Sequence, residues 1–124
     1  MKRIFGLILV LIAGLLVLSA CASYASRENI ATARQALEIA DDFLFRRNIS
    51  PETALSRVSR LPNINVQRTG NRNEDEANAV LRNAISRLES ALRENTHIMS
   101  AETRRPVVEA RNQIAAELGV RTRR

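Results

Sequence analysis

The 124-residue chain has few of the residues that build chemical sites or cross-link small folds. It has no tryptophan, one cysteine and one histidine, and aromatic residues make up only 3% of it. One cysteine excludes a disulfide within the chain. His97 is expected in a turn, with no further ligands at metal-binding spacing. There is no glycine-rich phosphate loop and no Gly-x-Ser-x-Gly motif. We therefore expect no enzyme, no metal site, no cofactor and no small-molecule substrate.

The N-terminus contains the one long apolar run. Two basic residues at 2–3 precede an apolar stretch at 4–18, and the small residues Ser19 and Ala20 then lead to Cys21. Basic charge, an apolar core and small residues follow one another in this order in secretory signal peptides. The apolar stretch is about 15 residues long, whereas a membrane-spanning helix requires roughly 20.

The segment Leu18-Ser19-Ala20-Cys21 resembles the lipobox of bacterial lipoprotein precursors. The resemblance covers only the N-terminal 21 residues. It implies that residues 1–20 are a signal peptide, with Leu18, Ser19 and Ala20 as the processing residues. It also implies that Cys21 receives lipid, palmitate included, and becomes the first residue of the mature chain.

The same resemblance implies a location in the bacterial cell envelope. Ala22, rather than aspartate, follows the cysteine, and in Gram-negative members of the family this implies the outer membrane facing the periplasm. Residues 21–27 would form a lipidated tether, so membrane contact would run through Cys21.

Two other interpretations of the N-terminus stay open. The apolar run could remain uncleaved as a membrane anchor, although it is short for one. Ordinary signal cleavage could occur at Ala20-Cys21-Ala22 or near Ala25, because both have small residues at the required positions. The product would then be a secreted protein without lipid.

The rest of the chain has a modest core and a smaller positive charge than the whole. Leu, Ile, Val and Phe account for 23 of the 103 residues in 22–124, near the threshold of about 20% below which chains tend to be disordered. This part has 17 arginines, no lysine and 13 acids, a net charge of +4. We therefore expect a protein partner or a homo-oligomer to support the fold. Because the arginines are interspersed with acids and the signal implies export, we expect no nucleic acid.

Apolar residues recur at helical spacing through this part, as Ile30, Ala33, Leu37 and Ala40 do. Ser50 before a proline, and Asn73 before three acids, are expected N-caps. The predicted helices are 28–47, 51–61, 74–95 and 101–118.

The predicted fold is an all-α bundle of about four helices at 28–120, with a linker near 62–73 and a basic tail at 121–124. The segments 48–53 and 97–103 have similar sequences, and each follows a long helix. This echo suggests two helix–turn–helix units.

Two charged groups stand out. Glu38, Asp41 and Asp42 cluster in the first predicted helix, and the spacing of four between Arg34, Glu38, Asp42 and Arg46 predicts a solvated ladder of ion pairs. In the tail, Arg121, Arg123 and Arg124 are candidate contacts for anionic lipid head groups.

These features predict a membrane-anchored interaction or adaptor module of the bacterial envelope. The alternative is a structural protein that self-associates through the seam Ala84, Leu88 and Ala91, or that contacts cell wall or anionic lipid.

Overall fold

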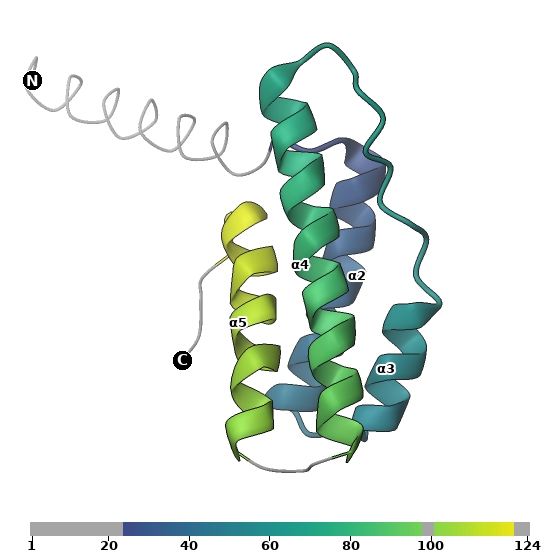
Figure 1. Ribbon diagram of the computed structural model, residues 1–124, viewed down its shortest axis with the longest axis vertical. Coiled ribbons are helices and arrows are strands. Elements are labelled where there is room, and N and C mark those ends of the chain that lie inside the picture. Colours follow the sequence, from purple (N-terminus) through teal and green to yellow (C-terminus); the bar gives the residue numbers. More distant parts are fainter. Residues whose placement is uncertain (1–23, 98–100, 121–124) are drawn as a thin grey trace, which may run out of the picture.

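The structure, a computed structural model, describes residues 24–97 and 101–120. These residues form four helices and no strand, which confirms the predicted all-α bundle (Figure 1). The helices are α2 (Arg27–Leu44), α3 (Pro51–Ser59), α4 (Arg72–His97) and α5 (Ala101–Glu117).

The helices share one core rather than forming two separate units. The long helices α2 and α4 pack against each other, and each also packs against α3 and α5. The flanking helices α3 and α5 lie on opposite sides of this central pair and do not touch (Figure 1). The two helix–turn–helix pairs suggested by the sequence are therefore parts of a single bundle.

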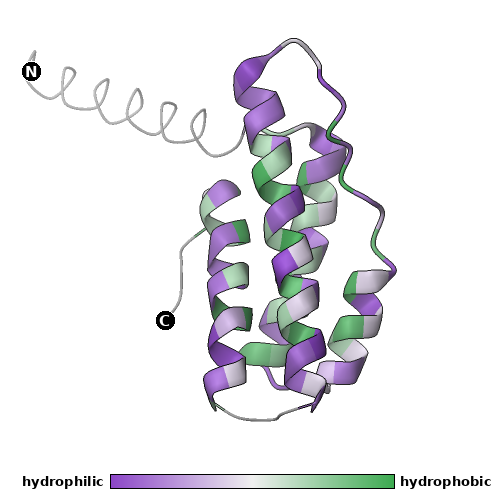
Figure 2. Cartoon of the chain, in the orientation of Figure 1, coloured by the Kyte–Doolittle hydropathy of each residue, from purple (hydrophilic) through white to green (hydrophobic). Residues whose placement is uncertain are grey.

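The core is built mainly from alanine and leucine. Ala33, Ala36, Ala40 and Ala84 are fully buried, as is Leu88. Figure 2 shows the apolar positions on the sides of the helices that face the bundle. Small side chains let helix backbones approach closely, so few large residues are needed to close this core.

The bundle begins earlier than the predicted tether allows. Ala25 is only 9% exposed and belongs to the core cluster. Ser26 caps α2, its Oγ accepting a hydrogen bond from the Asn29 amide at 3.4 Å. The predicted tether at 21–27 is therefore too long at its C-terminal end, because packing starts at Ala25. Helix α2 also ends at Leu44, before the predicted 47.

Helix α3 begins as predicted and α4 begins two residues early. The Ser50 Oγ accepts from the Thr53 amide at 3.2 Å, and Pro51 occupies the first turn. Ahead of α4 the capping side chain is Asn71, whose Oδ1 accepts from the amides of Asn73 and Glu74. The expected cap at Asn73 was wrong, and the linker between α3 and α4 is 60–71.

His97 is the last residue of α4 rather than part of the following turn. No helix in the described part of the chain combines the length and apolar character needed to cross a membrane.

Candidate functional site

The predicted lipidation and processing residues, Leu18 to Cys21, lie outside the described residues, and so do Arg121, Arg123 and Arg124. The structure does place the positions next to them. Helix α2 begins and helix α5 ends at the same end of the bundle (Figure 1). The chain entering from Cys21 and the chain leaving toward the tail therefore attach to one end of the molecule, the tether end.

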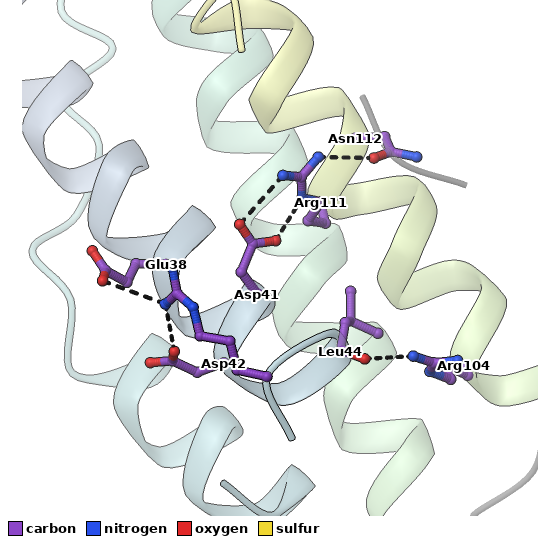
Figure 3. A network of polar contacts seen from close by, with 8 residues as sticks. Glu38, Asp41, Asp42, Leu44, Arg104, Arg111 and Asn112 are labelled. Carbon is purple, nitrogen blue, oxygen red and sulfur yellow. Dashed lines mark hydrogen bonds and ion pairs between the residues drawn. The ribbon is translucent and has the colours of Figure 1, made fainter. Parts of the chain in front are cut away.

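The acidic cluster on α2 divides into two environments. Asp41 faces α5 and pairs with Arg111, whose Nε lies 2.7 Å from Asp41 Oδ1 and whose Nη2 lies 3.3 Å from Oδ2 (Figure 3). The Arg111 side chain is 2% exposed and that of Asp41 is 17% exposed. The expectation that Asp41 belongs to a solvated surface ladder was wrong.

Arg111 is enclosed on further sides. Its Nη1 donates to Asn112 Oδ1 at 3.1 Å, and its Cζ lies 5.6 Å from the centroid of the Phe45 ring. A buried guanidinium requires an opposite charge and satisfied donors, because desolvating it alone costs several kcal/mol. The pair with Asp41 is therefore a structural clasp between α2 and α5.

The other two acids of the cluster contact Arg46, which is exposed, as predicted. Arg46 Nη1 lies 2.6 Å from Asp42 Oδ1 and 3.5 Å from Glu38 Oε1. The hydrogen bond to Asp42 and the charge of that carboxylate raise the pKa of Arg46 above its usual value. Arg34 forms no ion pair with any described residue, so the predicted ladder is shorter than its spacing suggests.

A second arginine from α5 reaches the C-terminal end of α2. Arg104 Nη2 donates to the carbonyl oxygen of Leu44 at 2.5 Å (Figure 3). The last carbonyls of a helix lack partners within the helix and carry partial negative charge. Arg104 therefore caps α2 from a neighbouring element.

Arg104 also lines a pocket at the end of the bundle opposite the tether end. The pocket measures about 390 Å³. Its walls are mostly apolar, with arginines from two different elements and one amide: Phe43, Leu44, Arg47, Ile49, Pro51, Asn95, Ala101 and Arg104. We call it the arginine pocket.

The arginine pocket has no acidic residue in its lining. Four other grooves lined by described residues each contain at least one carboxylate, such as Glu94 and Glu109 between α4 and α5 or Glu38 and Asp42 between α2 and α3. Those grooves therefore have both charges in their lining. In the arginine pocket, positive charge is not balanced by the lining.

Arg47 adopts an unusual backbone conformation in the turn between α2 and α3. Its φ is 53°, in the left-handed region, and no other non-glycine residue of the described chain has a positive φ. This region costs an L-residue with a side chain roughly 1–2 kcal/mol. Glycine would meet no such cost, so the turn geometry alone does not explain an arginine here.

A network of asparagine side chains holds the tether end together. Asn78 Oδ1 accepts from the Ser26 amide at 3.1 Å and from Asn29 Nδ2 at 2.8 Å. Asn29 also pairs with the backbone of Asn65, donating to its carbonyl and accepting from its amide. Both Asn29 and Asn78 are buried. The linker is thus fixed to α2 through Asn29, and Asn78 joins α2 to α4.

Two carboxylates at this end have displaced pKa values. The Thr69 amide and hydroxyl donate to Asp75 Oδ1 at 2.9 and 3.0 Å, and the amide hydrogen bond is the main reason that the pKa of Asp75 is lowered. Partial burial raises the pKa of Glu117. Asp75 thereby closes the turn that leads into α4.

Within 24–97 and 101–120, no three His, Cys, Asp or Glu side chains are grouped so that they could hold a metal ion. No protein-family model, no curated protein and no solved structure matches the chain. The assignment of a function therefore depends on the residues themselves.

Proposed function

We propose that the chain is a lipid-anchored helical module of the bacterial envelope that binds another protein. The observation that carries the proposal is the sequence Leu18-Ser19-Ala20-Cys21 at the end of a basic and apolar leader. A thiol at this position is an attachment point, since it has no partner for a disulfide in the chain.

The proposed anchor constrains how the bundle sits. Only three residues separate Cys21 from Ala25, which is already part of the core and lies four Cα–Cα steps along the chain. A fully extended chain of that length spans at most about 14 Å. An anchored protein would therefore keep its tether end close to the lipid surface, where Arg121, Arg123 and Arg124 could reach anionic head groups.

The anchor also explains how a small protein could bind usefully. Tethering two molecules to one membrane raises the effective concentration of each for the other, so a modest interface suffices. The end opposite the tether carries the arginine pocket and would face away from the lipid, toward the periplasm in a Gram-negative cell.

Self-association through the seam Ala84, Leu88 and Ala91 receives no support. All three side chains are buried inside the bundle, facing other helices of the same chain. A dimer that used this seam would first have to open the core.

Metabolic labelling tests the anchor. Cells expressing the full chain are grown with labelled palmitate, and the protein is expected to carry the label in the wild type but not in Cys21→Ala. Equal labelling of the two chains would contradict the proposal.

Co-purification tests the binding role. The tagged wild-type chain, cross-linked in cells and recovered from solubilised membranes, is expected to bring down one defined envelope protein. Recovery of only its own oligomers would favour the structural alternative instead.

A further inference from the structure

The arginine pocket has the properties of a binding site for a specific chemistry. Its apolar walls come from the end of α2 and the start of α3, and its two arginines come from the intervening turn and from α5. Pockets of this size, with mostly apolar walls and a few convergent polar groups, are where proteins bind ligands.

Arg104 is oriented in this pocket but not neutralised. Among the described residues, its one hydrogen bond runs from Nη2 to the neutral carbonyl of Leu44. A guanidinium has five N–H donors in a planar fork, so a single bond to a carbonyl fixes the group and leaves donors for a carboxylate. Its exposure is intermediate, and the residue lines the pocket.

Arg47 supplies the second charge and is exposed. It forms no ion pair with any residue in the described part of the chain. Its left-handed backbone costs stability that glycine would spare. An arginine at a position where its backbone conformation lowers stability is explained if its guanidinium binds a ligand at the surface.

We propose that the arginine pocket binds an acidic peptide segment of a partner protein, with a carboxylate on Arg47 and Arg104 and an adjoining apolar side chain against Phe43 and Ile49. The inference deepens the proposed function and rests on it for the orientation of the pocket away from the membrane. The choice of a carboxylate follows from charge complementarity, because the pocket lining has two arginines and no acid.

The test uses the full chain in detergent and a fluorescein-labelled peptide of alternating Glu and Leu residues. The matched probe has Gln in place of every Glu, and it reports any binding that comes from leucine or from detergent alone. Anisotropy is expected to show saturable binding of the Glu peptide that weakens with added salt, and little binding of the Gln peptide.

The decisive variant is Arg47→Gly, because it removes the charge while relieving the backbone. It is expected to raise the Kd about tenfold or more, as expected for a lost charge-assisted hydrogen bond, while its unfolding midpoint stays the same or rises. The control is Arg68→Gly, which removes an exposed loop arginine at the tether end and should leave the Kd within about twofold of wild type.

Three results would overturn the proposal: an unchanged Kd in Arg47→Gly, equal binding of the Gln peptide, or no binding of the Glu peptide by the wild-type chain. Failure of the anchor is distinguishable from these. Cys21→Ala should bind the peptide as the wild type does. The absence of palmitate labelling would therefore contradict the lipid anchor without contradicting the proposed peptide binding.

Discussion

Arg111 on α5 pairs with Asp41 on α2 through two hydrogen bonds, the shorter being 2.7 Å from Nε to Oδ1. The two residues are 70 positions apart in the chain. Their pairing joins α5 to α2 and places a charge inside a core built mainly from alanine and leucine. The clasp distinguishes two neighbouring aspartates that look alike in the sequence.

Asp41→Ala and Asp42→Ala should therefore differ widely in stability. Removing Asp41 takes away the carboxylate that pairs with the buried Arg111, and we expect a loss of about 3 kcal/mol in the free energy of unfolding. Removing Asp42 breaks only an exposed pair with Arg46, worth roughly 0.3–0.5 kcal/mol. Urea denaturation of the two variants beside the wild type measures both. Equal losses would contradict the clasp.

Arg47→Gly should stabilise the protein. The substitution removes the roughly 1–2 kcal/mol cost of a left-handed arginine, offset by the greater freedom of glycine in the unfolded chain. We expect a net gain of about 0.5–1 kcal/mol and a rise in Tm of a few degrees. Calorimetry of Arg46→Gly provides the control, since that residue has no positive φ and its replacement should lower the Tm. A fall in Tm for Arg47→Gly would show that the side chain itself supports the fold.

Asn29→Ala should loosen the linker. The change removes the side chain that bonds both backbone groups of Asn65 and also leaves Asn78 with fewer partners. We expect a loss of about 2 kcal/mol, because buried polar groups are left unsatisfied. Hydrogen exchange of the Asn65 amide should become much faster. Asn63→Ala, at an exposed linker position, should change neither quantity, and a protected Asn65 amide in Asn29→Ala would refute the role assigned to the network.

The turn that leads into α4 should open in acid. Because the Thr69 amide bond lowers the pKa of Asp75, the carboxylate supports the turn above the pKa it has in the unfolded chain. This support is lost as the pH falls through the lower pKa of the folded state. The chemical shift of the Thr69 amide should therefore titrate with a midpoint below about 3.9, the ordinary value for aspartate. A midpoint at or above that value, or an unaltered titration in Asp75→Asn, would contradict the assignment.

Periodicity was enough to predict the helices, but their ends depended on which of two suitable residues capped them. Asn71 and Asn73 both precede α4, and only the packed structure selects Asn71. The helical spacing of apolar residues in α5 also indicates that Arg111 is buried. Arg111 falls four residues after Val107 and three before Ile114, which places it on the buried stripe of α5, and a buried arginine requires an acid.

The sequence could not predict which acid pairs with Arg111, because α2 has several acids and the contact joins distant segments of the chain. The arginine pocket could not be predicted from the sequence either. It needs residues from the end of α2, the turn, α3, α4 and α5 to meet, and no local pattern marks Arg47 as left-handed.

The most direct test of the proposed function is the mass of the mature N-terminal peptide from protein purified out of bacterial membranes. The proposal predicts a chain that begins at Cys21, with a mass increased by acyl and diacylglycerol groups. An unmodified chain that retains residues 1–20, or one cut at a different site without lipid on Cys21, would contradict it.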